Sequence, residues 1–424
     1  MRVYCETFGC TMNRGDTETM LGCLTREKHE PVQVPELADV LIVNTCAVKG
    51  QTQKKVLRRL AELKEANGKP IVVTGCLPLV DPRSIERLGP FACITSCQAI
   101  GAIGEIVERV SHGESNLKVL RRNQDERPRA PKVRGDSASA IVSVAEGCLS
   151  NCSYCAVKLA RGDLRSYPPE LVVEEATQAI RAGYKEIRLT AQDTAAYGAD
   201  ICADLPSLIQ EISSIPGNFK IRVGMMNPTL AKRILPALLD AYKNEKVYKF
   251  LHIPVQSGDD GVLSSMRRGY TVDDFFGMVR AFRENFQDLQ LSTDVIVGFP
   301  GEGEEEFART LELVRKVKPD NVNVSRFTPM PKTDAAKMPQ VEGREVAKRS
   351  RALSELWHRI GHEINKAYVG RGEKGLVVDA GERSGFIVRL SNYKPVIVQE
   401  GTPGEFVNVK IVEARPTYLK GVLA

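Results

Sequence analysis

The sequence contains no apolar run of the length that a membrane-spanning helix needs. Its first residues, MRVYCETFGC, also lack the charged and then apolar layout of a signal peptide. We therefore expect a cytoplasmic protein with no membrane partner. Because the cytoplasm is reducing, we expect the eleven cysteines to act as metal ligands or reactive thiols and not as disulfides.

Length and composition indicate a globular protein and not a disordered or fibrous one. A chain of 424 residues with 42% hydrophobic content can bury a substantial core, and at typical domain sizes it divides into about three domains. The 59 Lys and Arg against 53 Asp and Glu give a net charge of +6. This excess favours an anionic partner without requiring one.

The first part of the chain, residues 1–111, alternates short apolar runs with helix-like segments. This pattern predicts a small α/β domain with a parallel sheet, whose expected strands are Arg2 to Phe8, Ala38 to Asn44 and Lys69 to Thr74. Residues 112–139 predict a basic linker, either a solvated hinge or a nucleic-acid contact, and its cations are Lys118, Arg121, Arg122, Arg127, Arg129, Lys132 and Arg134.

Residues 140–363 repeat a strand and helix pattern six times, which predicts an incomplete (β/α)6 barrel with its chemistry at the carboxyl ends of the strands. The expected strands are Ile141 to Ala145, Glu186 to Thr190, Lys220 to Gly224, Lys249 to Val255, Leu289 to Val297 and Asn321 to Phe327. The last helix, after Gly343, has an apolar stripe. Residues 364–424 contain alternating runs cut by Gly and Pro, which predict a small β-barrel.

Three cysteines, Cys148, Cys152 and Cys155, lie within eight residues directly after the first barrel strand. A 4Fe-4S cluster takes four ligands, so three thiolates leave one iron open to a substrate or cosubstrate. Zinc is the alternative, but a structural zinc normally takes four protein ligands, and no histidine lies near this loop. The triplet therefore favours an iron-sulfur cluster.

A second set, Cys10, Cys46 and Cys76, is dispersed in sequence, but each member directly follows a predicted strand. The carboxyl ends of parallel strands share one edge of a sheet, so these thiols can converge on one ligand. The alternative is that they are ordinary buried small hydrophobic residues. The same placement on three successive units favours convergence. Cys93 and Cys97 are interpreted as core residues.

The Cys-x3-Cys-x2-Cys loop, with Tyr154 before its last cysteine, resembles the signature of radical S-adenosylmethionine enzymes. In that family the open iron holds the methionine moiety of S-adenosylmethionine, and electron transfer yields a 5′-deoxyadenosyl radical. The resemblance implies that Tyr154 lies beside the adenine and that Gln192 and Asp193 lie near the methionine amino group. Other strand-end candidates for cofactor contact are Gln256, Ser257, Asp294, Gly298 and Phe327.

Taken together, the domain order and the motifs resemble the methylthiotransferase family over essentially the whole chain. The motifs are Gly9-Cys10-x-x-Asn13, Asn44-Thr45-Cys46, Gly75-Cys76, the loop from Glu146 to Cys155, Ala160-Arg161-Gly162 and the run from Thr293 to Glu302. The family implies a second 4Fe-4S cluster on Cys10, Cys46 and Cys76 and the use of two S-adenosylmethionine molecules. It also implies a sulfur donor and an electron donor such as ferredoxin or flavodoxin.

Within this family, three segments look most like the archaeal and eukaryotic branch that modifies threonylcarbamoyl-adenosine in tRNA, and they are 155–162, 191–198 and 222–228. The C-terminal module resembles a TRAM domain, which implies contact with a tRNA anticodon stem-loop. The alternatives are methylthiolation of isopentenyl-adenosine or of a ribosomal-protein aspartate, and a non-catalytic iron-sulfur RNA-binding protein.

One position departs from the family pattern. The common Arg-Pro-Gly-Thr run appears here as Met330-Pro331-Lys332-Thr333, with lysine in place of glycine. This change leaves the local backbone geometry open, and we expect a cation near the carboxylate of the substrate.

Overall fold

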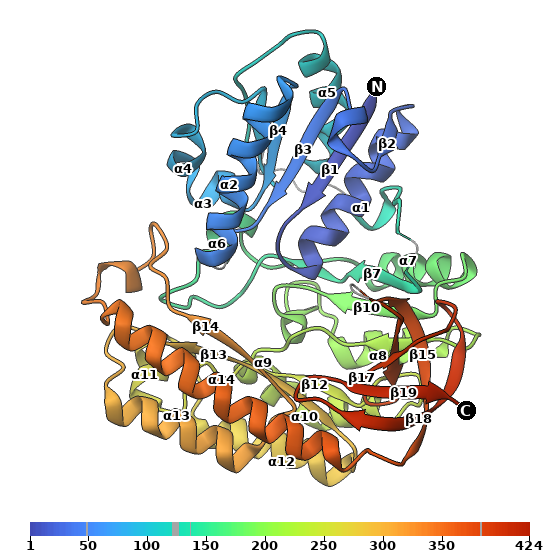
Figure 1. Cartoon of the computed structure of the whole chain (residues 1–424), viewed down its shortest axis with the longest axis vertical. Coiled ribbons are helices and arrows are strands. Elements are labelled where there is room, and N and C mark those ends of the chain that lie inside the picture. The colour runs from blue at the N-terminus through green and yellow to red at the C-terminus, as the bar shows by residue number, and fades with distance from the viewer. Residues whose placement is uncertain (48–49, 121–126, 136, 382–383) are drawn as a thin grey trace. The chain divides into compact units, whose positions relative to one another are not determined.

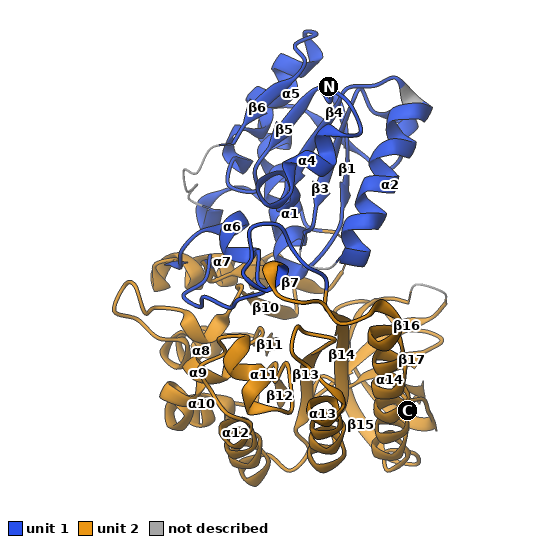
Figure 2. Cartoon of the chain, turned by 90° about the vertical axis from the view of Figure 1, so that its left-hand side faces the viewer, with its two compact units in different colours: residues 1–134, 146–165, 328–336 blue, residues 135–145, 166–327, 337–424 orange. Residues whose placement is uncertain are grey.

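The computed structural model describes the chain except for residues 48–49, 121–126, 136 and 382–383, so part of the predicted linker, including Arg121 and Arg122, lies outside the described residues. The chain folds into two compact units (Figure 2). Unit 1 contains residues 1–134, 146–165 and 328–336, and unit 2 contains residues 135–145, 166–327 and 337–424. The predicted domain boundaries stay a prediction.

Unit 1 is built on a six-stranded parallel sheet with the order β2-β1-β3-β4-β5-β6 (Figure 1). Every residue of β3 and β4 is buried, as expected for central strands of a parallel sheet covered on both faces. The strands are β1 (Arg2–Thr7), β2 (Glu30–Val32), β3 (Val40–Thr45), β4 (Ile71–Gly75), β5 (Cys93–Thr95) and β6 (Leu117–Val119). The helices are α1 (Thr11–Arg26), α2 (Gly50–Asn67), α3 (Leu77–Val80), α4 (Pro82–Glu86), α5 (Ile103–Ser111) and α6 (Val157–Arg161).

Unit 2 contains the six parallel strands of the predicted incomplete barrel, in two sheets with the orders β11-β10-β7 and β12-β13-β14. A hydrogen bond from Tyr248 N to Ile221 O, 3.0 Å long, joins the two sheets. The strands are β7 (Ser139–Ser143), β10 (Glu186–Thr190), β11 (Lys220–Arg222), β12 (Phe250–His252), β13 (Gln290–Val297) and β14 (Asn321–Arg326).

Helices cover this barrel in the alternating order that the sequence predicts. They are α7 (Pro169–Arg181), α8 (Leu205–Ser214), α9 (Pro228–Ala231), α10 (Leu235–Tyr242), α11 (Asp260–Ser265), α12 (Val272–Asn285), α13 (Glu304–Val317) and α14 (Gly343–Lys366). Two short strands, β8 (Ala145–Glu146) and β9 (Arg165–Ser166), flank the loop that carries the first cysteine triplet. Among the described residues, no helix combines the length and the apolar character that crossing a membrane requires.

The C-terminal part of unit 2 is a closed five-stranded barrel with the order β15-β16-β17-β19-β18, which confirms the predicted β-barrel. Its interior is filled by aliphatic side chains such as Val377, Val388, Val396 and Val409. The strands are β15 (Gly372–Ala380), β16 (Phe386–Leu390), β17 (Pro395–Val398), β18 (Phe406–Ala414) and β19 (Leu419–Leu423).

Helix α14 packs closely against the loop between β18 and β19. A Cβ atom added to Gly361 would lie 2.5 Å from the carbonyl oxygen of Pro416. One turn later, Asn365 Nδ2 donates to Arg415 O at 2.7 Å, and Lys394 Nζ donates to Asn365 Oδ1 at 2.8 Å. The small-residue contact and the buried hydrogen bonds together hold the C-terminal barrel on the helix.

We predict that Gly361→Ala lowers the free energy of unfolding by about 1–3 kcal/mol, because the added methyl group overpacks the contact with Pro416. Helix propensity alone would make the alanine variant more stable by about 1 kcal/mol. A loss of stability can therefore be assigned to the contact with Pro416. Urea unfolding measures the effect. Gly343→Ala, at the start of the same helix with nothing within 4 Å, is the matched control. A Gly361→Ala protein at least as stable as the parent would contradict the close approach.

Candidate active site

The loop of the first cysteine triplet lies in unit 1 and is closed at its two ends by glycines. Gly147 has φ 78° and Gly162 has φ 81°, a left-handed conformation that favours glycine. A Cβ atom on Gly147 would lie 1.9 Å from Asp163 O, and Cys148 N donates to Gly162 O at 3.3 Å. The glycines therefore allow the loop to begin and end at one point.

Backbone amides of this loop point at its sulfur atoms. Ser150 N lies 3.3 Å from Cys148 Sγ, and Val157 N lies 3.4 Å from Cys155 Sγ. Cys148, Cys152 and Cys155 are all half-buried. Amide donors stabilise thiolates and tune the clusters bound to them. The loop is therefore suited to hold a cluster through its three thiolates.

The second triplet lies at the carboxyl edge of the unit 1 sheet, as the sequence predicts. Cys10 follows β1, Cys46 follows β3 and Cys76 follows β4. The thiols of Cys10 and Cys76 lie 4.0 and 3.8 Å from the same atom, Asn13 Oδ1. A Cβ atom on Gly9 would lie 2.9 Å from Cys46 Sγ. The three strand ends are thus brought to one region, and their soft sulfur donors are of the type that iron-sulfur clusters take.

The structure shows convergence but not a closed ligand set. Over the described ranges, no three or more His, Cys, Asp or Glu side chains are grouped closely enough to hold a metal ion. Ligation by either triplet therefore stays a prediction, supported by the loop geometry and the shared sheet edge.

Cys97 is a fourth thiol at this edge, and it is buried, as expected from the sequence. It lies just beyond β5, and its N donates to Gly75 O at 3.2 Å. Its thiol approaches Ala160 O at 3.4 Å, and its hydrogen bond to Cys76 lowers the pKa of the Cys76 thiol and raises that of Cys97. The signal that could have found it is that, like the triplet, it follows a short strand.

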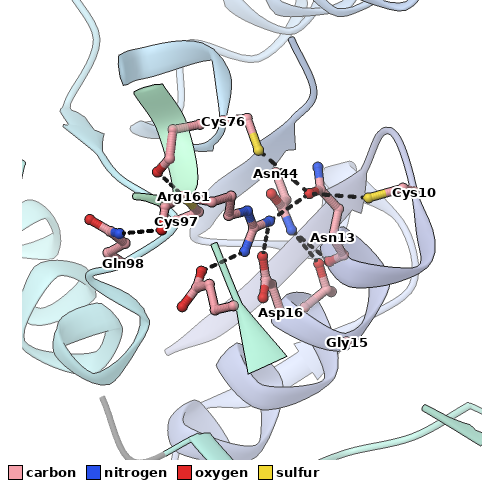
Figure 3. A network of polar contacts seen from close by, with 12 residues as sticks. Cys10, Asn13, Gly15, Asp16, Asn44, Cys76, Cys97, Gln98 and Arg161 are labelled. Atoms are coloured by element: carbon pink, nitrogen blue, oxygen red, sulfur yellow. Dashed lines mark hydrogen bonds and ion pairs between the residues drawn. The ribbon is translucent and has the colours of Figure 1, made fainter. Parts of the chain in front are cut away.

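A buried set of four charges lies between the two cysteine-bearing regions of unit 1, and Figure 3 shows two of them, Asp16 and Arg161. Arg161 donates to Asp16 at 2.6 Å and to Glu146 at 2.9 Å. Arg127 pairs with the same two carboxylates. All four side chains are at most 7% exposed. Arg127 is therefore a core residue, which corrects the expectation of a solvated linker at this position.

The strand-end residues of the unit 2 barrel include one unusual carboxyl group, that of Asp193. Its Oδ1 accepts from Ala195 N at 3.1 Å and from Asn227 N at 3.0 Å, while its buried Oδ2 has no hydrogen-bond partner. Burial raises the pKa of Asp193 to about 6. An unpartnered buried carboxylate oxygen is suited to a cation, which agrees with the predicted place near an ammonium group. Gln192 precedes it on the same loop.

Two further predicted residues lie side by side across neighbouring strands. Gln256 N donates to Asp294 O at 2.8 Å, and Gln256 has a left-handed φ of 67°. The Oε1 of Gln256 is buried without a partner. Asp294 Oδ2 lies 2.9 Å from His252 Nε2, so His252, at the end of β12, joins this group. His252 is not among the site residues predicted from the sequence, although it lies within a predicted barrel strand.

The remaining residues that were predicted to contact the cofactor lie mainly against other residues of the fold. Phe327 N donates to Val297 O at 2.9 Å, directly before Gly298, and the Phe327 ring packs edge-on against Phe299. The hydroxyl of Ser257 lies 3.5 Å from Thr310 Oγ1. Tyr154 is half-buried in the cysteine loop. Cofactor contact by these residues stays a prediction.

Sequence profiles match three regions of the chain. The Radical SAM superfamily matches residues 142–314, the Uncharacterized protein family UPF0004 matches residues 2–95, and the TRAM domain matches residues 367–424. A relative from Pyrococcus horikoshii, with the name "Probable threonylcarbamoyladenosine tRNA methylthiotransferase", is 46% identical over 99% of both chains. The chain belongs to the threonylcarbamoyladenosine tRNA methylthiotransferase family.

More distant members of this family also align along the whole chain. The Homo sapiens protein, "Threonylcarbamoyladenosine tRNA methylthiotransferase", is 34% identical over 99% of this chain and 73% of its own length. Among solved structures, the radical S-adenosylmethionine methyltransferase TsrM from Kitasatospora setae has a TM-score of 0.59 at 13% identity, covering 79% of this chain and 74% of its own. That likeness shows the fold alone. Radical SAM membership implies S-adenosylmethionine and a 4Fe-4S cluster.

We predict that Asp193 makes the stability of the protein fall as the pH rises from 4 to 7. Its pKa is about 6 in the folded state, against roughly 4 in an unfolded chain. The folded state therefore keeps a proton that the unfolded state has lost, and the stabilisation is present below pH 4 and lost through pH 6. The unfolding free energy of the parent minus that of Asp193→Asn should fall by about 3 kcal/mol between these limits. A pH-independent difference in urea unfolding would contradict this assignment.

Proposed function

We propose that this chain adds a methylthio group to C2 of N6-threonylcarbamoyladenosine next to the anticodon of tRNA, using two molecules of S-adenosylmethionine. The observation that carries the proposal is that one compact unit holds both the Cys148, Cys152 and Cys155 loop and the three strand-end cysteines. The first triplet is assigned to a 4Fe-4S cluster that, with S-adenosylmethionine bound, supplies the radical. The second triplet is assigned to an auxiliary 4Fe-4S cluster.

The chain's own residues have three roles in this proposal. Backbone amides of the loop hold the thiolates of Cys148 and Cys155. The buried carboxyl group of Asp193 receives the amino group of S-adenosylmethionine, because its Oδ2 needs a cationic partner. The closed C-terminal barrel binds the tRNA backbone, and that binding weakens with salt. A cytoplasmic location, an electron donor such as ferredoxin or flavodoxin, and a sulfur donor belong to the same proposal.

The segment that carries Lys332 supports the choice of substrate. Lys332 is exposed and has a left-handed φ of 65°. Glycine, the residue common in the family at this position, adopts that conformation without steric cost. Within unit 1, Ala335 N donates to Ser153 O at 2.9 Å, so this segment is attached to the first cysteine loop. An exposed cation held next to that loop suits the carboxylate of the threonyl group.

We predict that Cys155→Ala abolishes the modification, because it removes one of three ligands of the radical-generating cluster. The measurement is mass spectrometry of digested tRNA from cells with the parent gene, the variant or no gene. Only the parent should give a methylthio mass shift on threonylcarbamoyl-adenosine. Reduced purified protein should also release 5′-deoxyadenosine from S-adenosylmethionine.

The same measurements separate the alternatives. A methylthio mass shift on isopentenyl-adenosine would identify that nucleoside as the substrate. Unmodified tRNA together with a modified ribosomal-protein aspartate would identify the ribosomal protein as the substrate. Binding of tRNA without any release of 5′-deoxyadenosine would identify a non-catalytic RNA-binding protein.

We predict that Lys332→Ala lowers kcat/KM about 10-fold for tRNA that carries threonylcarbamoyl-adenosine, the size expected for one lost charge-assisted hydrogen bond. Lys332→Arg should retain most of the activity, and Lys332→Gly should match the alanine variant although it relaxes the backbone. Lys318, an exposed lysine with φ 48° in unit 2, offers the control Lys318→Ala. Unchanged activity of Lys332→Ala would remove the lysine from substrate recognition.

A further inference from the structure

The side chain of Asn13 contacts the backbone beside two of the strand-end cysteines. Its Nδ2 donates to Phe8 O at 2.7 Å and to Thr45 O at 3.0 Å. Phe8 lies two residues before Cys10, and Thr45 lies directly before Cys46. Asn13 is completely buried. Both donors of its amide are therefore used to hold the segments that lead into these two cysteines.

The third cysteine is tied to the same group. Cys76 N donates to Thr45 O at 3.0 Å, the carbonyl that also accepts from Asn13. The thiols of Cys10 and Cys76 both face Asn13 Oδ1 (Figure 3). One amide group thus connects all three strand ends.

Arg161 fixes which way this amide points. Its Nη2 donates to Asn13 Oδ1 at 2.8 Å. Arginine has only donors, so the oxygen of the amide must face it and the nitrogen must face the two carbonyls. Arg161 is in turn held by Asp16 and Glu146. Burial lowers the pKa of Arg161, but Asp16 and the other acidic groups around it together outweigh that effect and raise the pKa, so the group stays ionised.

Arg161 is also part of the first cysteine site. It is the last residue of α6, which begins two residues after Cys155, and Glu146 lies two residues before Cys148. The guanidinium therefore joins both ends of the radical-cluster loop to Asn13. This connection lies entirely within unit 1.

We propose that Arg161 and Asn13 are positioning residues that couple the two cysteine sites. Arg161 sets the orientation of the Asn13 amide, and Asn13 sets the positions of Cys10, Cys46 and Cys76. The inference rests on the proposed auxiliary cluster for its role in the reaction. Its geometric part concerns the cysteines themselves and is tested without a cluster.

The first experiment measures the auxiliary site alone. In full-length protein with Cys148, Cys152 and Cys155 changed to alanine, anaerobic reconstitution should load about four iron atoms per chain. Asn13→Asp keeps the oxygen for Arg161 but puts a second oxygen against two carbonyls. We expect it and Arg161→Gln to weaken iron retention against a chelator about 10- to 100-fold, as for other residues that orient metal ligands. The electron paramagnetic resonance spectrum of the reduced cluster should change as well.

Asn365 in unit 2 provides a matched control. Its Nδ2 also donates to two carbonyls, Arg415 O and Pro416 O, and its Oδ1 also accepts from a cation, Lys394. Asn365→Asp should lower stability by a similar mechanism while leaving the iron content and the spectrum unchanged. Equal iron loss in Asn13→Asp and Asn365→Asp would show a general folding defect and overturn the proposal.

The double variant tests the coupling itself. If Arg161 acts through Asn13, the loss in Asn13→Asp/Arg161→Gln should equal that of the larger single variant and not the product of the two losses. Independent, multiplicative losses would overturn the link between the two residues.

A second readout uses the metal-free protein. Alkylation of Cys76 by iodoacetamide is followed by peptide mass spectrometry across a range of pH, because Cys97 and Arg161 both lower the pKa of this thiol and only the thiolate reacts. The rate per ionised thiol should be faster in Asn13→Asp and Arg161→Gln than in the parent and in Asn365→Asp. Unchanged alkylation would contradict the positioning role. If alkylation changes as expected but the parent triple-alanine protein retains no iron, the positioning role stands and the proposed auxiliary cluster fails.

Discussion

The four buried charges of Asp16, Arg127, Glu146 and Arg161 connect the two cysteine-bearing regions of unit 1. Each arginine pairs with both carboxylates, so the set is neutral and every charge has a partner. Breaking one buried pair typically costs about 3–5 kcal/mol. Arrangements of helix α1 and the cysteine loop that separate these pairs are therefore higher in free energy. The close placement of a thiol-rich loop and a thiol-rich sheet edge depends on this set.

The structure also explains why the sheet edge suits this chemistry. Parallel strands deliver Cys10, Cys46 and Cys76 to one edge, and the glycine at position 9 leaves room for the sulfur of Cys46. Cys97 adds a hydrogen bond to Cys76 from the next strand. The site geometry therefore supports the proposed pair of cysteine sites.

Much of the fold could be predicted from the sequence, because long periodic segments carry the signal. All six barrel strands lie where the alternation of apolar residues placed them, and β10 matches its predicted bounds. The three-residue strands β2, β5 and β6 were missed, whereas the equally short β11 and β12 were found because they lie inside longer predicted segments. Because β5 was missed, Cys97 was not recognised as a strand-end cysteine. Arg127 was read as a solvated cation, because its partner Asp16 lies 111 residues away in sequence. The Asn13 and Arg161 motifs were visible, but their contact spans 148 residues and needed the structure.

The central claim is that both cysteine triplets hold a cluster in the same molecule. The most direct measurement is the iron and sulfide content of the anaerobically reconstituted full-length protein, together with its Mössbauer spectrum. The account predicts about eight iron atoms and eight sulfide ions per chain, in two 4Fe-4S clusters. A content of about four irons that disappears when Cys148, Cys152 and Cys155 are changed to alanine would contradict it, because the second triplet would then hold no cluster.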